Sequence, residues 1–320
     1  MTPILIIGAG IAGLACARRL VDGRLADGRL ADGRLAPVLL DKGRGLGGRV
    51  ATRRVGAMQF DHGAQHVTAH NASFAAVLDA MAMTGALADW PDGTLRKHRV
   101  GAPGMSAIPK AIGVGLDIRH GVQATRLVQD GDAWVVQSDD GPIRAKRVVV
   151  TVPAPQVAGL LGPDHPLVAA LAPVRMAPCL TLMAATKAPA PFVTRQDSDD
   201  VLTWIAQDST KPGRPQGNAA LWVAQAGEAF STQHLEQDPA AIAAAMLPHF
   251  CDRLGMTPTA VTHAAAHRWR YARVTQALGQ PFLISADATL YLGGDWCIGA
   301  RIEAAWDSGT AIADDILARG

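Results

Sequence analysis

The sequence predicts an α/β fold in which a Rossmann-like, dinucleotide-binding domain is interleaved with a second, α+β domain. Three patterns support this prediction: an apolar run, a glycine motif and a helical pattern at the N-terminus; strands with tight turns over residues 121–153; and an apolar strand end, a glycine pair and a helical pattern after residue 290. With 320 residues, 49% hydrophobic and 18% charged, the chain can bury a substantial core in one large domain or two interleaved ones.

The N-terminal pattern has the form of a nucleotide-binding strand, turn and helix. Residues 4–7 read Ile-Leu-Ile-Ile and lead into Gly8-Ala9-Gly10-Ile11-Ala12-Gly13, after which apolar residues recur at helical spacing. Gly8 permits the tight turn, Gly10 lets a pyrophosphate approach the backbone, and Gly13 allows the helix to pack closely on the sheet. The helix N-terminus would then face the phosphates, although an ordinary glycine turn is the alternative.

A second strand, residues 38–41, ends in Asp41, the acid expected to hold ribose hydroxyls. Asp41 lies 28 residues after Gly13, and the excess over the usual spacing comes from a tandem pentapeptide repeat at residues 21–35. Each copy contains a glycine, which weakens a helix. A period of five residues does not place the apolar residues of successive copies on one face of a helix. We therefore expect an insertion between the first helix and the second strand. A tolerated surface insertion and a partner-binding segment are both compatible with this pattern.

The acid at position 41 favours a free 2′-hydroxyl, and therefore FAD or NAD over NADP. A basic, glycine-rich loop follows at residues 42–49, with Lys42, Arg44, Gly48 and Arg49. A second loop of this kind can close over a pyrophosphate from the side opposite the first helix. The combination favours FAD.

Charge and cysteine content exclude several classes of protein. The 30 basic and 28 acidic residues are too evenly balanced for a surface that follows nucleic acid phosphates. The four cysteines are widely spaced, without zinc-ligand spacing, which favours reduced thiols and a cytoplasmic protein. We also expect no metal site, no signal peptide and no membrane partner, because no apolar stretch reaches the roughly 18 residues of a membrane helix.

Four segments carry a family resemblance. The glycine motif, the acid and the later Gly-Leu-Gly-Gly-Arg at residues 45–49 resemble the flavin-containing amine oxidase superfamily. Residues 60–66 (Phe-Asp-His-Gly-Ala-Gln-His) resemble the D-x-G-A-Q-Y stretch of renalase-like proteins, with His66 in place of tyrosine. Residues 267–273 (His-Arg-Trp-Arg-Tyr-Ala-Arg) and 292–309, with Gly-Asp-Trp-Cys, resemble two blocks of bacterial renalases.

The resemblance implies a GR2-type flavoprotein fold that is amine oxidase-like. It assigns residues 1–71, 101–155 and 261–320 to FAD binding, and residues 72–100 and 156–260 to a substrate domain. FAD would be non-covalent, since residues 255–292 contain no cysteine. The expected cofactor contacts, including a backbone contact of Val122 with adenine, are Gly8, Gly10, Ala12, Gly13, Asp41, Lys42, Arg44, Gly48, Arg49, Gln65, His66, Val122, Gly294, Asp295, Arg301, Ile302 and Ala305.

The expected chemistry is hydride transfer from a small molecule to the flavin. Trp269, Tyr271 and Trp296 either surround the substrate or pack in the core, and His62 and His66 are candidates to polarise the flavin or the substrate. The resemblance to bacterial renalases implies oxidation of isomeric dihydronicotinamide dinucleotides, with electrons passed to molecular oxygen. Oxidation of a small amine, or a non-catalytic FAD-binding role with the repeat as contact surface, are the alternatives.

Overall fold

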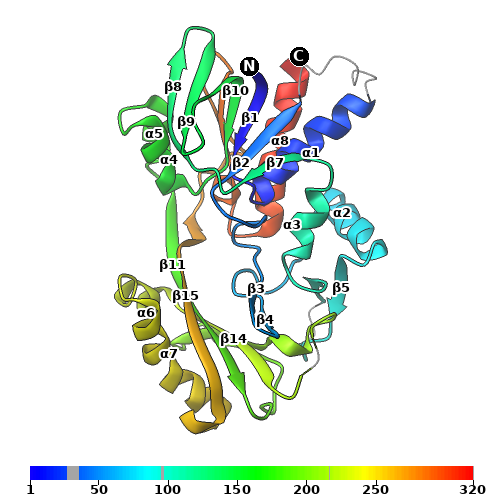
Figure 1. Ribbon diagram of the computed structural model, residues 1–320, viewed down its shortest axis with the longest axis vertical. Helices are drawn as coiled ribbons and strands as arrows, with labels where there is room; N and C mark the ends of the chain where they lie inside the picture. Colours follow the sequence, from blue (N-terminus) through cyan, green and yellow to red (C-terminus); the bar gives the residue numbers. More distant parts are fainter. Residues whose placement is uncertain (27–35, 95–96, 216, 320) are drawn as a thin grey trace. The chain divides into compact units, whose positions relative to one another are not determined.

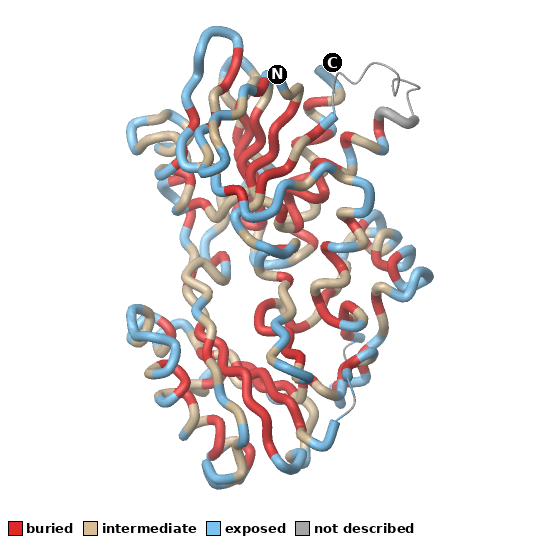
Figure 2. Tube along the Cα trace, viewed as in Figure 1, coloured by how far each residue is buried: buried red, intermediate tan, exposed pale blue. Residues whose placement is uncertain are grey.

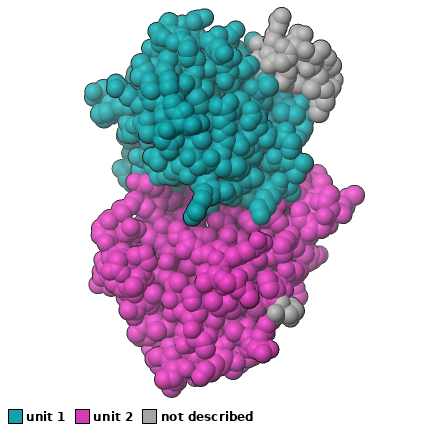
Figure 3. Space-filling view, viewed as in Figure 1, with its two compact units in different colours: residues 1–48, 109–176, 274–320 teal, residues 49–108, 177–273 magenta. Residues whose placement is uncertain are grey.

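Strand β1 (Thr2–Ile7) belongs to the first of two compact units into which the chain divides. In the computed structural model, which describes residues 1–26, 36–94, 97–215 and 217–319, unit 1 comprises residues 1–48, 109–176 and 274–320. Unit 2 comprises residues 49–108 and 177–273, and Figure 3 distinguishes the two units by colour. Each unit therefore combines segments that are far apart in the sequence.

The sheet of unit 1 has a parallel centre and antiparallel additions. Its strands run in the order β16-β17-β10-β1-β2-β7, and the hairpin of β8 and β9 pairs with β10. The four central pairings are parallel, and Leu5 lies opposite Val38 on one side and Val148 on the other. The remaining strands are β2 (Pro37–Asp41), β7 (Asp117–His120), β8 (Ala124–Asp130), β9 (Ala133–Ser138), β10 (Ile143–Val150), β16 (Leu283–Ile284) and β17 (Leu290–Leu292).

Helices cover the sheet of unit 1, where α1 (Ile11–Ala26) packs against α8 (Ile302–Arg319). Close packing of these two helices needs glycine, because a Cβ on Gly309 would lie 2.0 Å from the carbonyl oxygen of Ala12. The short helices are α3 (Ala107–Ile112), of which residues 109–112 belong to unit 1, α4 (Ala154–Leu161), α5 (Pro166–Ala169) and the 3-10 turn η4 (Asp295–Cys297). Apolar residues of the sheet, α4 and α5 form one core.

Unit 2 is built on a five-stranded sheet in the order β12-β13-β14-β11-β15, which buries one face beneath α6 and α7 (Figures 1 and 2). Trp222, Phe250 and Met246 are fully buried in that core. The strands are β11 (Arg175–Thr186), β12 (Thr194–Gln196), β13 (Leu202–Gln207), β14 (Ala220–Ala226) and β15 (Val261–Gln276), and the helices are α6 (Glu228–Gln233) and α7 (Pro239–Leu254).

Capping signals fix the ends of α7. The Asp238 carboxylate accepts hydrogen bonds from the amides of Ala240 and Ala241, both at 2.9 Å, and Gly255 ends the helix with φ 65°. Smaller elements complete unit 2: the hairpins β3 (Arg53–Val55) with β4 (Met58–Phe60) and β5 (Leu87–Trp90) with β6 (His98–Gly101), helix α2 (Ala72–Met83), and the 3-10 turns η2 (Asp208–Thr210) and η3 (Pro258–Ala260).

The pentapeptide repeat at residues 21–35 departs from the prediction in its first copy. Helix α1 continues through Gly23 to Ala26, so the insertion does not begin where the helix ends. A Cβ on Gly23 would lie 2.6 Å from a methyl group of Leu317 in α8, so the glycine that weakens the helix also fits the helix pair. Residues 27–35 lie outside the described residues.

The other major elements are confirmed, including the turn at Gly131 between β8 and β9. None of the described helices has the length and apolar character required to cross a bilayer. The assignment of residues 1–71, 101–155 and 261–320 to FAD and of residues 72–100 and 156–260 to the substrate stays a prediction, because it concerns what each part binds.

Candidate functional site

The glycine motif of unit 1 forms a turn that excludes side chains on one side and leaves space on the other. Gly8 has φ +105°, and a Cβ on Gly13 would lie 1.9 Å from the carbonyl oxygen of Gly8. A Cβ on Gly10, by contrast, would meet nothing within 4 Å. The turn and α1 therefore fit tightly together, while open space remains at Gly10, beside the first turn of α1, whose amides have no partner within the helix.

The second glycine loop lies directly against the first. The amide of Gly47 donates to the carbonyl of Ala9 at 2.9 Å, and Gly10 and Gly47 form an isolated parallel bridge. Gly48, with φ +53°, would place a Cβ 3.9 Å from the Cα of Gly10. The two loops thus form one backbone-lined cradle, and the side chains of Lys42 and Arg44 are exposed beside it.

The Asp41 carboxylate ties the two loops together. One oxygen accepts the amide of Ala9 and the other accepts the amide of Gly43, each at 2.7 Å. The main-chain carbonyl of Asp41 accepts the amide of Val122 at 3.0 Å. That hydrogen bond uses the single N–H of Val122, so only its carbonyl could contact an adenine.

The C-terminal glycine pair also lies in unit 1. The amide of Gly293 donates to Val150 and that of Gly294 to the hydroxyl of Ser308, which places both glycines at the end of the sheet. Asp295 is 6% exposed and opens η4, and Ile302 begins α8 with Ala305 in its first turn. The guanidinium of Arg301 is half exposed and 3.9 Å from the buried Glu303. These predicted contacts therefore gather around the start of α8.

Trp296 lies in the core of unit 1, as one of its two predicted roles requires. Its side chain is fully buried in the core of unit 1, and its indole N–H donates to the carbonyl of Val152 at 3.0 Å. Trp269 and Tyr271 lie in unit 2 and are half-buried. Only the latter two retain exposed surface for a substrate.

In unit 2, the predicted flavin-contacting turn at residues 61–65 is held by side chains from other segments. The carbonyl of His62 accepts the indole N–H of Trp269 at 2.7 Å, and that of Gly63 accepts the side-chain amides of Gln65 at 3.0 Å and Gln225 at 2.7 Å. A Cβ on Gly63 would lie 1.9 Å from the carbonyl oxygen of Arg49. The backbone carbonyls of His62 and Gly63 are thereby engaged, which restricts the conformation of the turn.

Arg49, whose carbonyl oxygen lies next to Gly63, is linked to β15, because its guanidinium donates to the carbonyl of Ala272 at 2.8 Å.

His66, the next residue after the turn, stacks on His98 with ring centroids 3.9 Å apart. His98 in turn contacts the buried Asp92 carboxylate through Nδ1 at 2.7 Å. Burial raises the pKa of the Asp92 carboxyl, but hydrogen bonds from Thr94 lower it further, so that this pKa lies below its usual value. Candidate residues 62 and 66 therefore occupy different clusters.

His62 belongs to a cluster of three rings with His267 and Trp269. Ring centroids are 4.7 Å apart for His62 and His267, 5.2 Å for His62 and Trp269, and 4.4 Å for His267 and Trp269. Burial, reinforced by His267 and Arg53, lowers the pKa of His62 to about 3, and burial with Arg53 lowers that of His267 to about 4. Both imidazoles are therefore neutral near pH 7 and cannot serve as proton donors there.

The depressed pKa of His62 makes stability fall as the pH is lowered. An unfolded histidine titrates near 6.5, whereas folded His62 stays neutral down to about pH 3, so between these values the unfolded chain binds one more proton. This proton contributes about 1.4 kcal/mol per pH unit to the loss of unfolding free energy on acidification. His62→Gln should remove that part of the slope, measured by chemical denaturation between about pH 6 and about pH 4.

The same substitution at the exposed His120 of β7 is the matched control. A His62→Gln variant whose slope equals that of the unsubstituted protein would contradict a buried, neutral imidazole at position 62.

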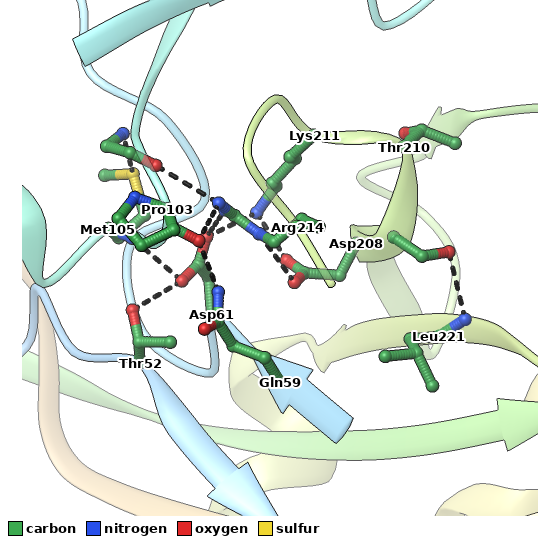
Figure 4. Close-up of polar contacts among 12 residues, drawn as sticks. Thr52, Gln59, Asp61, Pro103, Met105, Asp208, Thr210, Lys211, Arg214 and Leu221 are labelled. Atoms are coloured by element: carbon green, nitrogen blue, oxygen red, sulfur yellow. Dashed lines mark hydrogen bonds and ion pairs between the residues drawn. The ribbon is translucent and has the colours of Figure 1, made fainter. Parts of the chain in front are cut away.

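A buried group of two acids and two bases lies beside the 61–65 turn (Figure 4). Asp61 and Asp208 face Lys211 and Arg214, and all four side chains are at most 1% exposed. Burial raises the pKa of Asp208. We call these four residues the charge quartet. Sequence reasoning named none of the four as a site residue, and the Lys-Pro-Gly-Arg run at residues 211–214 is typical of a solvated loop.

Comparisons with known proteins agree with this geometry. A family described as NAD(P)-binding Rossmann-like domain matches residues 6–81, which contain the glycine cradle. A second, described as flavin containing amine oxidoreductase, matches residues 88–317, well over half of the chain. The chain belongs to the flavin-containing amine oxidoreductase family. It is therefore a FAD-dependent oxidoreductase.

Solved structures share the fold at low sequence identity. A candidate protoporphyrinogen oxidase from Exiguobacterium sp. 255-15 superposes with a TM-score of 0.79 at 14% identity, over 100% of this chain and 99% of that one. Putrescine oxidase bound to putrescine gives 0.68 at 13% identity, over 99% of each chain, and a double mutant of putrescine oxidase gives 0.70 at 13%, again over 99% of each. These likenesses establish the amine oxidoreductase fold.

The residues of unit 1 fit the FAD of this family. The open space that a Cβ on Gly10 would enter lies at the N-terminus of α1. The second glycine loop borders this space through the bridge between Gly10 and Gly47. Helix N-termini and backbone amides of this kind bind phosphate. The Asp41 carboxylate stands beside the same cradle, where each oxygen keeps a second lone pair for a ribose hydroxyl.

Proposed function

We propose that this family member is a renalase-like oxidase of isomeric dihydronicotinamide dinucleotides. The substrate would lose a hydride from the wrong ring carbon to become NAD(P)+, and the two electrons would pass to molecular oxygen, giving peroxide. The sequence resemblance to bacterial renalases at residues 60–66, 267–273 and 292–309 supports this substrate class. The observation that carries the proposal is the charge beside the ring cluster of unit 2.

Arg53 provides that charge. Its guanidinium lies 3.4 Å from Nδ1 of His267, it is exposed, and no carboxylate of the described residues forms an ion pair with it. On β15, Arg268 and Arg270 point to the opposite side from His267 and Trp269. Both oxygens of the Glu236 carboxylate accept hydrogen bonds from Arg270, and Arg268 lies 3.9 Å from the same carboxylate. A cationic amine is repelled by an unneutralised arginine, whereas the pyrophosphate of a dinucleotide is attracted to it.

The ring cluster suits hydride transfer. The bound flavin supplies the two-electron acceptor, and a hydride leaves a dihydronicotinamide ring without a general base. Neutral His267 and the half-buried Trp269 and Tyr271 offer flat, uncharged surfaces on which a planar ring can stack, and the neutral, buried His62 packs against His267 and Trp269. The protein's part is therefore to orient the substrate and to limit water around it.

We propose that FAD is held without a covalent bond, with contacts from the glycine cradle, Asp41 and the segment from Gly294 to the start of α8. Cys297 follows the C-terminal glycine pair, but it is fully buried. Burial raises the pKa of its thiol to about 12. The thiol therefore remains protonated and unreactive toward a flavin.

Anaerobic mixing with candidate substrates tests the proposed function. Isomers of NADH and NADPH made by borohydride reduction should bleach the visible absorption of the flavin within one turnover, and a panel of amines that includes putrescine should not. Admission of oxygen should then restore the absorption and release peroxide. Bleaching by amines alone would assign the protein to amine oxidation instead, and bleaching by neither class would support a non-catalytic role.

Arg53→Gln should weaken binding of the dinucleotide substrate selectively. Hydrogen bonds between charged groups contribute about 1.5–3 kcal/mol, so the KM for the dinucleotide should rise by about tenfold or more. The corresponding dihydronicotinamide riboside, which has no phosphate, should keep its KM. Steady-state oxygen consumption measures both.

Arg54→Gln is the matched control, because Arg54 is the neighbouring exposed arginine of β3 and points to the other side of the strand. Equal effects of the two substitutions on the dinucleotide, or an effect of Arg53→Gln on the riboside, would contradict a phosphate contact at Arg53.

A further inference from the structure

The charge quartet of unit 2 contacts both ends of the predicted flavin-contacting turn, residues 61–65. The ammonium group of Lys211 lies 3.3 Å from the Asp61 carboxylate, 2.7 Å from Asp208 and 3.3 Å from the side-chain oxygen of Gln65. The ammonium donates hydrogen bonds to Asp61 and Gln65, and it forms an ion pair with Asp208. Lys211 thus joins residue 61 to residue 65, the two ends of the turn.

The other contacts fix Asp61 in the same position. The Asp61 oxygen that faces Lys211 also contacts Arg214 (Figure 4). The other carboxylate oxygen accepts hydrogen bonds from the hydroxyl of Thr52 at 2.7 Å and from the amide of Met105 at 2.9 Å. Arg214 is anchored in turn by the carbonyls of Gly101 and Pro212, each at 3.2 Å. The turn is therefore held against two further segments of unit 2.

Electrostatics favour a specific role for this arrangement. Burying ions is costly, and packed apolar side chains would often stabilise a fold as well or better. The quartet carries two charges of each sign, so that it is neutral overall, and its hydrogen bonds impose directions that apolar side chains do not. Compared with apolar side chains, the buried ions at this place therefore fix the position of the 61–65 turn.

We propose that Lys211 is a positioning residue for the flavin, which holds the 61–65 turn in the geometry that the cofactor requires. The proposal rests on the expected contacts of Gln65 and His66 with the flavin. It does not depend on which substrate is oxidised, because Lys211 acts through the turn and touches neither substrate nor cofactor.

Two variants separate position from charge balance. Lys211→Met removes the cation at similar volume and leaves two buried carboxylates with Arg214, so it should both destabilise the apoprotein and weaken FAD binding by about tenfold or more. Adding Asp208→Asn restores overall neutrality but not the bridge from Asp61 to Gln65. The double variant should therefore regain most of the apoprotein stability, while its FAD dissociation constant and the visible circular dichroism of its flavin stay altered.

Chemical denaturation of the apoprotein, FAD titration and the flavin spectrum are all measured without substrate, so a failed substrate hypothesis leaves this test intact. The exposed pair of Arg270 and Glu236, bonded at 2.6 and 2.9 Å, provides the control through Arg270→Met alone and with Glu236→Gln. Recovery of both stability and FAD binding in the Lys211 double variant would overturn the proposal. Unchanged FAD binding in Lys211→Met would also overturn it. Failure of the double variant to fold would overturn it as well, because Lys211 would then be required for the fold itself.

Discussion

Gly13→Ala is expected to destabilise the apoprotein by about 3 kcal/mol and to weaken FAD binding by about a hundredfold. The added Cβ would lie 1.9 Å from the carbonyl oxygen of Gly8 and 2.9 Å from the hydroxyl of Thr151. Both the turn and the end of the sheet would have to move, since the obstructing oxygen of Gly8 belongs to the backbone. Chemical denaturation of the apoprotein and titration with FAD measure the two effects.

Gly10→Ala separates folding from binding. Its Cβ would meet nothing within 4 Å of the protein, so the apoprotein should keep its stability. The same methyl group would occupy the space through which a pyrophosphate approaches α1, so FAD binding should still be weakened. Equal losses of apoprotein stability in the two variants would contradict the distinct roles assigned to Gly10 and Gly13.

The parts of the site that could be predicted from sequence are local. The cradle depends on Gly8, Gly10 and Gly13 within six residues and on an acid at the end of the next strand, and such patterns are readable because neighbours in sequence are neighbours in space. The start of α8 was predictable for the same reason. The first repeat copy was the exception, since it is helical and Gly23 lies close to Leu317 of α8, a contact between distant segments that no local rule includes.

The parts that escaped prediction depend on contacts between distant segments. Lys211 and Asp61 are separated by 150 positions, and Gln225 and Gly63 by 162. A lysine, a proline, a glycine and an arginine in succession are typical of a solvated loop, and only the fold shows that Lys211 and Arg214 are buried. Trp296 illustrates the same limit, because an aromatic residue beside a glycine pair fits a cofactor pocket and a core equally well until its burial is known.

Asp61→Ala should cause a loss of stability of about 3–5 kcal/mol in the apoprotein, the range found when one member of a buried ion group is removed. Lys211 and Arg214 would then face a single carboxylate, Asp208, while the hydroxyl of Thr52 and the amide of Met105 would lose their acceptor. Asp61→Asn should cost less, because an amide oxygen still accepts from Thr52 and Met105.

Chemical denaturation of the apoprotein checks this order, with Asp89→Ala as the control. Asp89 also pairs with an arginine, Arg99 at 3.3 Å, but its side chain is 82% exposed, so its removal should change stability little. The contrast isolates burial as the cause, because each substitution deletes one carboxylate from an ion pair of unit 2. A loss for Asp61→Ala no larger than that for Asp89→Ala would mean that water reaches the charge quartet, and that the 61–65 turn is not held as the structure shows.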